Sequence, residues 1–398
     1  MQIRPVFSAL RHHRFTTAMI VLEIALACAV LCNACFVVVG QLRMLRIQSG
    51  IDESSLAVVT LGNFDRDRLA DINARALEGL RGIDGVTTVN VVEGLPFVDA
   101  GGASVSVDPE GQRGRYAADF YFGDRDALRT LGVNLLEGQM PHDEDLSATA
   151  DDTQRVYITQ SLARELWPHD DALGKSMWCC NGARFRVVGV MRQLIRAMPR
   201  DDGASNWSVF TAKRLGEMSS AQFLLRAEPD RLDAALRQVR MAMARQVPDA
   251  TLDDSATGKV GDLRDRYFHS NRATANMLAG TMLALLGVTA LGIVGLTGYW
   301  VQQRRKQIGV RRALGATRAD ILHYFQTENF LIVALGMVPG GLLAYLFNMA
   351  LMKHYELPRL PVFYLLIAAV VLWLLGQLAV LGPAMRAAAV PPVVATRS

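Results

Sequence analysis

The sequence has few of the residue patterns that indicate catalysis or metal binding. Its 398 residues include seven histidines and five cysteines, and no pair of CxxC motifs or Cys/His spacing typical of a zinc site is present. No run of lysine and arginine is interleaved with aromatic residues, and no segment has low complexity. These absences argue against a zinc module and against nucleic acid as a partner. The hydrophobic pattern is therefore the main source of information.

Charged residues are also scarce. They make up 20% of the chain, against 51% apolar residues, and the mean hydropathy is +0.18. A chain of this composition is too apolar for an ordinary soluble protein and too charged to lie wholly within a membrane. The composition predicts two parts, one embedded in lipid and one in water.

Four windows have the length of about 20 apolar residues that a membrane-spanning helix needs. The predicted spans are residues 16–40, 275–301, 329–352 and 362–381. Only the first contains a charge, Glu23. A cleaved signal sequence is the rival interpretation of the first window, but a signal core has about 7–15 apolar residues and this stretch is longer. We therefore expect an uncleaved anchor.

The short flanks of these spans predict the orientation. Lysine and arginine gather before the first span, between the second and third, and after the fourth, whereas the loop 353–361 carries only Lys353 and Arg359. The positive-inside rule then puts both termini and the loop 302–328 in the cytoplasm. Residues 1–15 would form an amphipathic segment on the inner leaflet, 382–398 a cytoplasmic tail, and 41–274 an extracytoplasmic domain.

The extracytoplasmic domain has the same pattern at its beginning and its end. Each end reads strand, helix, strand, in the segments 56–61, 65–80 and 86–92 and again in 223–227, 230–247 and 250–252. The middle, about 98–215, has strand-like pieces at 156–159 and 184–190, and its acidic stretch 142–152 is expected to be a solvated loop. The fold class is thus a membrane protein with four transmembrane α-helices and a large α+β domain inserted between helices 1 and 2.

The cysteines and the one nucleotide-like motif give no active site. Cys179 and Cys180 are adjacent and allow a vicinal disulfide as one alternative, while Cys28, Cys32 and Cys35 are small filler within the first span. Gly174-Lys175-Ser176 looks like the end of a phosphate-binding loop, but His169 occupies the position where that loop needs glycine. We expect a non-catalytic chain that binds no cofactor of its own.

Within the spans, glycine spacing and one carboxylate are candidate functional features. The glycines recur every third or fourth residue, as Gly292, Gly295 and Gly298 in the second span and Gly336 and Gly340 in the third. Close helix packing is the favoured role, with gating as the alternative. Glu23 is a functional candidate because intramembrane charges usually are. The alternative is an ion pair with Arg14, or a side chain that reaches the interface.

The basic loop between the second and third spans has a pattern that its charge alone does not explain. Small residues lie between two larger apolar ones, Ile308 and Leu314. Small residues permit close approach of another surface, and apolar ones can anchor in a groove. A protein-docking element is therefore favoured over a plain loop, followed by a short helix from Arg318 to Phe325.

This loop resembles the coupling element of the MacB/FtsX-type ABC transporter permeases, whose pattern is similar to E-I-G-I-R-R-A-L-G-A. Residues 308–316 read I-G-V-R-R-A-L-G-A, and Gln307 departs from the pattern because it stands where the family usually has glutamate. Residues 121–138, 159–178 and 185–190 resemble the family's periplasmic core, Glu328-Asn329-Phe330 opens the third span as the family does, and 382–388 resembles its C-terminal tail. The resemblance covers nearly the whole chain.

The resemblance implies a set of partners and a way of working. An ABC ATPase that uses ATP and Mg²⁺ would dock on the loop, and a second permease copy would complete a homodimer or heterodimer. The implied coupling residues are Ile308, Gly309, Arg311, Arg312, Ala313, Leu314, Gly315 and Ala316, with Glu328 at the membrane edge. The implied function is mechanotransmission that drives export of a periplasmic drug, peptide or lipid-linked cargo, with a periplasmic adaptor and an outer-membrane channel as further candidate partners.

Two alternatives share the same architecture. One is an FtsX-like signalling subunit that controls an extracytoplasmic partner such as a cell-wall hydrolase, and the other is a lipoprotein-release permease. The size of the outer domain and its resemblance to the MacB core favour export over signalling.

Overall fold

The computed structural model describes residues 14–112, 114–146, 153–179, 182–200, 203–355 and 359–389. It divides into two compact units, which are described separately below. One unit is Met44–Ser270, and the other combines Met1–Arg43 with Asn271–Ser398. Most of the predicted amphipathic segment 1–15 lies outside the described residues.

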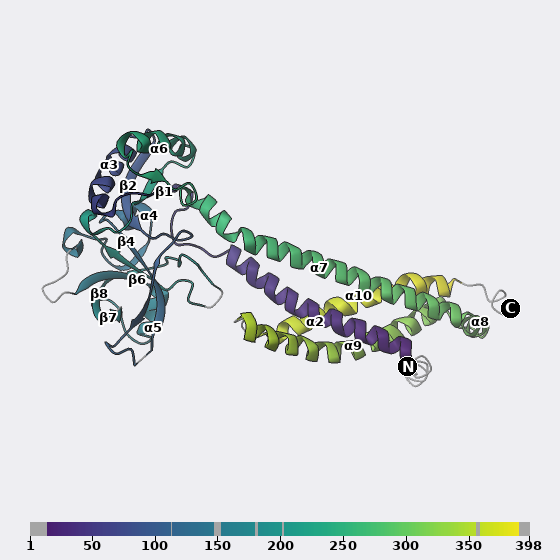
Figure 1. Ribbon diagram of the computed structural model, residues 1–398. Helices are drawn as coiled ribbons and strands as arrows, with labels where there is room; N and C mark the ends of the chain where they lie inside the picture. Colours follow the sequence, from purple (N-terminus) through teal and green to yellow (C-terminus); the bar gives the residue numbers. More distant parts are fainter. Residues whose placement is uncertain are drawn as a thin grey trace. The chain divides into compact units, whose positions relative to one another are not determined.

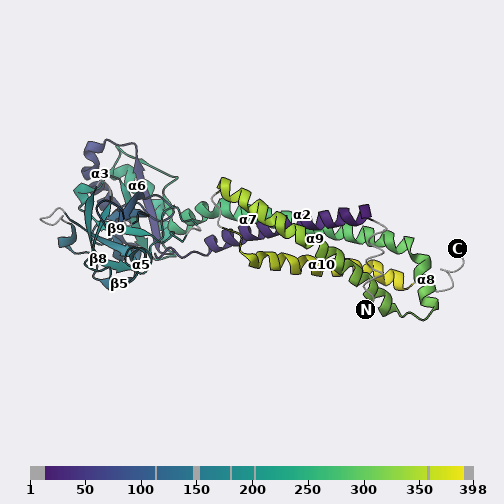
Figure 2. The same cartoon turned by 90° about the horizontal axis from the view of Figure 1, so that it is seen from below.

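Four helices that lie wholly or mostly in the second unit are long and apolar enough to cross a membrane. They are α2 (Arg14–Leu45), α7 (Val260–Gln303), α9 (Arg318–Tyr355) and α10 (Val362–Ala388), joined between α7 and α9 by the short helix α8 (Arg305–Ala313). In this unit they run alongside one another in both views (Figures 1 and 2). The four predicted spans are confirmed as candidate spans. Below we call this unit the membrane unit and the other the α+β domain.

The helices differ from the predicted spans mainly in length. The predicted short helix Arg318–Phe325 and the third span are one continuous helix, α9. The reason is local, because residues 326–328 read Gln-Thr-Glu and contain no glycine or proline that would end a helix. Pro339 lies inside α9 and does not interrupt it.

The α+β domain begins and ends with the two predicted strand–helix–strand units. They are β1 (Leu56–Gly62), α3 (Leu69–Arg81) and β2 (Val86–Glu93), then β10 (Gln222–Ala227), α6 (Leu232–Gln246) and β11 (Thr251–Leu252). The strand order is β11-β1-β10-β2 with antiparallel neighbours, so each unit places one strand between the two strands of the other. This split βαβ arrangement explains how ends far apart in sequence form one sheet.

Helices α3 and α6 lie next to each other on this sheet (Figure 1). Their inward faces share one apolar cluster with the strands, in which Ile72, Ala76 and Leu80 of α3 meet Val239 and Met243 of α6. The spacing of three and four residues within each helix puts these side chains on one face. The predicted amphipathic faces are therefore confirmed.

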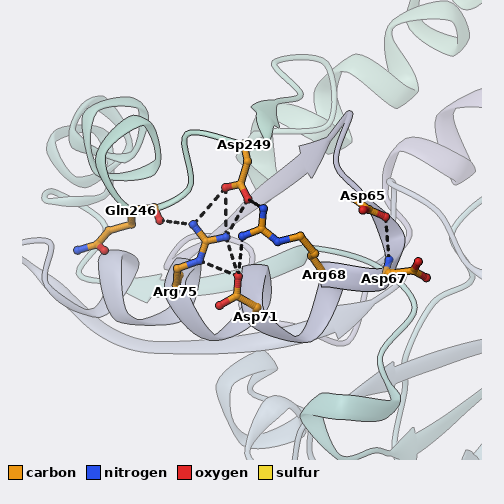
Figure 3. A network of polar contacts seen from close by, with 7 residues as sticks. All are labelled: Asp65, Asp67, Arg68, Asp71, Arg75, Gln246 and Asp249. Atoms are coloured by element: carbon orange, nitrogen blue, oxygen red, sulfur yellow. Dashed lines mark hydrogen bonds and ion pairs between the residues drawn. The ribbon is translucent and has the colours of Figure 1, made fainter.

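A network of charged side chains joins the outer surfaces of these helices (Figure 3). Arg75 of α3 holds Asp249 with both terminal nitrogens, at 3.0–3.1 Å, and its Nη1 also donates to the Gln246 carbonyl at 2.9 Å. Arg68 approaches the same Asp249 carboxylate at 2.8 Å, and Asp71 pairs with both arginines. The network fixes the end of α6 against α3 from the solvent side.

The insertion between these units forms a closed barrel. Its strands are β3 (Gly101–Ser106), β4 (Tyr116–Gly123), β6 (Gln154–Thr159), β7 (Ser176–Cys179), β8 (Ala183–Met191) and β9 (Ser208–Ala212), with β5 (Leu135–Gly138) beside β8 and the helices α4 (Ala127–Leu131) and α5 (Gln160–Leu166). The ring runs β4-β3-β7-β8-β6-β9 and closes where β9 pairs with β4. Side chains such as Phe120, Ile158 and Val187 fill its interior.

The structure of this domain also bears on two smaller predictions, the acidic loop and the cysteine pair. The acidic stretch 142–152 contains the short 3-10 helix Asp143–Leu146, and Asp145 accepts hydrogen bonds from Arg155 at 2.9 Å and from the Tyr157 hydroxyl at 3.2 Å. This part of the stretch is thus anchored to β6 rather than freely solvated, and residues 147–152 lie outside the described residues. Cys179 is disulfide-bonded, whereas Cys180 also lies outside them.

Candidate functional site

The candidate site is the connection between the second and third spans. Arg304 lies between α7 and α8 and belongs to the hydrogen bonding of both, because its N–H donates to the Trp300 carbonyl and its own carbonyl accepts from the Ile308 N–H. Its backbone leaves the helical range (φ −98°, ψ 10°), which turns the chain from one helix into the next. In both views α8 extends from the end of α7 (Figures 1 and 2).

Short-range sequence signals end α8 and begin α9. Gly315 has φ +101°, a left-handed conformation that glycine adopts without strain, and its N–H donates to the Arg312 carbonyl. Thr317 and Asp320 then cap each other's backbone N–H groups, at 2.9 and 3.2 Å. This reciprocal capping is the arrangement expected where a helix starts. The sequence L-G-A-T-R-A-D thus encodes the end of α8, the turn that follows and the start of α9.

Helix α8 has an anchored face and an open face. Ile308 and Gly309 are buried, and Ile308 packs in an apolar cluster with Ile321 and Phe325 of α9 and with the end of α10. On the other face Val310 and Leu314 are exposed, Leu314 by 83%. The two apolar residues that the sequence suggested as anchors therefore point in different directions: Ile308 into its own bundle and Leu314 into solvent.

Three arginines attach α8 to the spans. Arg304 pairs with Glu328 of α9, Arg311 lies over the Tyr324 ring of α9 at 5.0 Å, and the Nη1 of Arg312 donates to the Ala388 carbonyl of α10 at 2.9 Å. The predicted coupling residues Arg311 and Arg312 thus contact their own chain. Ala313, Gly315 and Ala316 follow at the open end of α8, where Ala313 and Gly315 are exposed.

The Arg304–Glu328 pair is buried. The Arg304 Nη1 lies 3.1 Å from each Glu328 carboxylate oxygen and 3.4 Å from the Tyr324 hydroxyl, and Glu328 is 2% exposed. The Arg304 guanidinium also lies 5.9 Å from the centre of the Trp300 ring. Sequence reasoning selected Glu328 but not its partner. The two residues are 24 positions apart, and the signal for Glu328 was the sequence Glu-Asn-Phe at the start of the third span.

Four of the five predicted packing glycines fall into two groups. A Cβ at Gly336 would lie 2.7 Å from the Ile24 Cγ2, and one at Gly340 would lie 2.7 Å from the Cys28 Cβ, so α9 approaches α2 too closely for any larger residue. By contrast, no described heavy atom lies within 4 Å of a Cβ built at Gly295 or Gly298. These two positions leave open space on α7 in the single chain.

Glu23 lies against the remaining glycine. Its carboxylate oxygens would be 2.7 and 2.9 Å from a Cβ at Gly292 of α7, so the absence of a side chain there makes room for it. The side chain of Arg14, the predicted ion-pair partner, lies outside the described residues. Gly376 of α10 has a similar role that sequence reasoning missed, since a Cβ there would lie 2.9 Å from the Asn329 Nδ2.

The described part of the α+β domain has open hollows on its surface. One hollow of about 460 Å³ is lined by polar residues that include Arg46, Arg192 and Gln193, all within this domain. Among the described residues, no group of three or more His, Cys, Asp or Glu side chains could hold a metal ion.

Two family models match the chain, and together they cover most of it. The model of the MacB-like periplasmic core domain matches residues 17–242, and the model of the FtsX-like permease C-terminal domain matches residues 279–392. The second match includes α8, Arg304 and Glu328.

Individual relatives agree with these models. The macrolide export ATP-binding/permease protein MacB of Vibrio parahaemolyticus is 25% identical over 334 residues, which are 78% of this chain and 49% of that protein. The uncharacterized ABC transporter permease YvrN of Bacillus subtilis is 27% identical over 292 residues, 70% of this chain and 69% of that protein. The chain thus spans about half the length of the MacB relatives it matches. Among solved structures, the periplasmic region of MacB from Actinobacillus actinomycetemcomitans matches 56% of this chain and 97% of its own length, with 14% identity and a TM-score of 0.36.

Proposed function

Since this chain belongs to the family of ABC transporter permeases that join a MacB-like periplasmic core domain to an FtsX-like C-terminal domain, we propose that it is the membrane subunit of such a transporter and works with a separate ATPase. ATP and Mg²⁺ would be bound by that ATPase and not by this chain. One relative that supports the proposal is YvrN, which is named an ABC transporter permease.

The observation that carries this proposal is the open face of α8. Val310, Ala313 and Leu314 are exposed on a helix whose other face is fixed to the bundle through Ile308. A short amphipathic helix of this kind can insert its apolar residues into a groove of another protein. Basic side chains surround these residues, which suits a partner with acidic residues at the rim of that groove.

The proposed cycle needs no passage of substrate through the bundle. Closure of two ATPase subunits would displace α8 in each of two permease copies, the spans would shift, and the α+β domains would open or close on a substrate outside the membrane. The substrate class is a drug, a peptide or a lipid-linked cargo. This proposal places the chain in a bacterial inner membrane, with α8 and both termini in the cytoplasm, because arginine and lysine concentrate there.

The further partners belong to the same proposal. A periplasmic adaptor and an outer-membrane channel would carry exported cargo onward from the α+β domain. The FtsX-like signalling role and lipoprotein release are compatible with the same architecture, and no feature of the described residues favours either of them over export.

Co-purification in detergent tests the proposed coupling site. We expect wild type to retain an ATPase subunit from a panel of candidates, and Leu314→Asp to release it because a carboxylate cannot enter an apolar groove without losing its hydration. Met198→Asp is the matched control: Met198 is also an exposed apolar residue, but it lies in the α+β domain, so this variant should retain the ATPase. The proposal would be contradicted if both variants retained the ATPase, or if wild type retained no ATPase with or without nucleotide.

A further inference from the structure

The buried ion pair of Arg304 and Glu328 has a feature that the docking role of α8 does not use. The backbone of Arg304 takes part in two helices. Its N–H donates a hydrogen bond to the Trp300 carbonyl in α7, and its carbonyl accepts one from the Ile308 N–H in α8. Its side chain reaches a third helix, since Glu328 lies on α9. One residue therefore connects the second span, α8 and the third span.

The surroundings of the pair make this connection stiff. Separating two charges in a site of low dielectric is far more costly than separating an exposed pair. The adjoining cavity, lined by Trp300, Glu328 and Asn329 among others, has a volume of about 10 Å³. That is the size of one water molecule, so this cavity gives the Glu328 carboxylate no space to swing into, and no larger ligand fits there.

The other attachments of α8 are different in kind. Arg312 makes a hydrogen bond to the backbone carbonyl of Ala388, and Arg311 is exposed where it lies over the Tyr324 ring. The end of α8 at Arg304 is held by the ion pair with Glu328, and the end at Leu314 projects into solvent.

We propose that the Arg304–Glu328 pair is the rigid link through which a displacement of α8 is passed to α9, so that the two residues position the third span and do not themselves dock the ATPase. This inference rests on the proposed function. It assigns different tasks to the two ends of α8: the exposed end around Leu314 receives the partner, and the buried end at Arg304 passes the movement on.

The test uses the full chain with its ATPase in detergent micelles and the double variant Arg304→Met/Glu328→Met. Replacing a buried ion pair by apolar side chains of similar volume usually preserves the fold, so the variant should still bind the ATPase through Leu314. The readout is hydrogen exchange of the α+β domain with and without ATP. In wild type we expect an ATP-dependent change in exchange rate, and in the double variant a reduction of that change by about tenfold, within the usual range of coupling between distant sites.

Arg304→Lys is the second variant, because it keeps the positive charge and loses the planar group that contacts both carboxylate oxygens. It should fold, bind the ATPase and respond to ATP less than wild type does. A full response in both variants would overturn the inference and leave the proposed function intact. If wild type binds an ATPase but its α+β domain does not respond to ATP, the inference and the proposed cycle both fail. If wild type binds no ATPase, the proposed function itself fails and takes the inference with it.

Discussion

The two units of this chain place their ion pairs in very different surroundings. In the membrane unit, the side chains of Arg304 and Glu328 are 13% and 2% exposed. In the α+β domain, the barrel pair Arg196–Asp119 is 21% and 9% exposed, and the pair Arg75–Asp249 on the helical surface is 28% and 30% exposed. The three pairs form a series in which the same kind of ion pair becomes more and more exposed to water.

This series separates two roles of charge in one protein. A charge in an apolar environment depends strongly on its counter-charge, whereas an exposed charge is stabilised by water and by neighbours that can substitute for one another. Asp249 illustrates the second case, since both Arg68 and Arg75 contact it. We therefore expect loss of one partner to matter most in the membrane unit and least on the helical surface.

The largest effect is expected for Glu328→Ala. Removal of the carboxylate leaves the Arg304 guanidinium buried without a counter-charge, and losses of about 3–5 kcal/mol are typical of such changes. Hydrogen exchange of the full chain in detergent micelles measures this loss locally, as reduced protection of the α9 amides. Arg304→Met/Glu328→Met is the control, and it should recover most of the protection because both charges of the ion pair are replaced by apolar side chains. Equal protection in wild type and Glu328→Ala would show that the site is wetter than its burial indicates.

Asp119→Ala is expected to have an intermediate effect. Its carboxylate accepts from the Arg196 Nε and from the Ala197 N–H, both at 2.9 Å, and so attaches the segment after β8 to strand β4 of the barrel. Loss of a buried acceptor of this kind costs about 1–3 kcal/mol. Faster exchange should appear in residues 192–200 and be absent from helix α3, which lies in the other part of the domain. Asp119→Asn keeps an acceptor oxygen and should lose less; an equal loss in both variants would mean that the hydrogen bonds do not determine the effect.

The difference between the units also explains which parts of the structure could be predicted from the sequence. Span length, basic flanks and helical or alternating periodicity are local properties, so the four helices and both strand–helix–strand units were predictable. The turn from Gly315 to Asp320 is local as well. Closure of the barrel is not, because it depends on the pairing of β4 with β9, whose strands are about 90 residues apart in the chain.

The candidate site shows the same limit at the scale of single residues. Sequence pattern identified the loop 302–328 and the carboxylate at Glu328, but not which basic residue would face it. Helical phase decides that question: α8 turns Ile308 inward and Leu314 outward, and the bend at Arg304 directs its side chain to α9. Such directions depend on the angle between two helices, which no short motif encodes.

The smallest effect is expected for Asp249→Asn, and its pH dependence tests the surface end of the series. Hydrogen bonding from the Arg75 side chain lowers the pKa of Asp249 below its usual value. A carboxylate with a lowered pKa stabilises the folded state above its unfolded pKa of about 3.9, and this contribution is lost as the pH falls through the lower folded value. Wild type should therefore differ slightly from Asp249→Asn at neutral pH and not at all below the folded pKa. The difference should also shrink in 1 M salt, where charges are screened within about 3 Å. Thermal unfolding of the full chain across this pH range measures both dependences, and a difference that persists in acid would mean that the Asp249 contacts act through packing rather than charge.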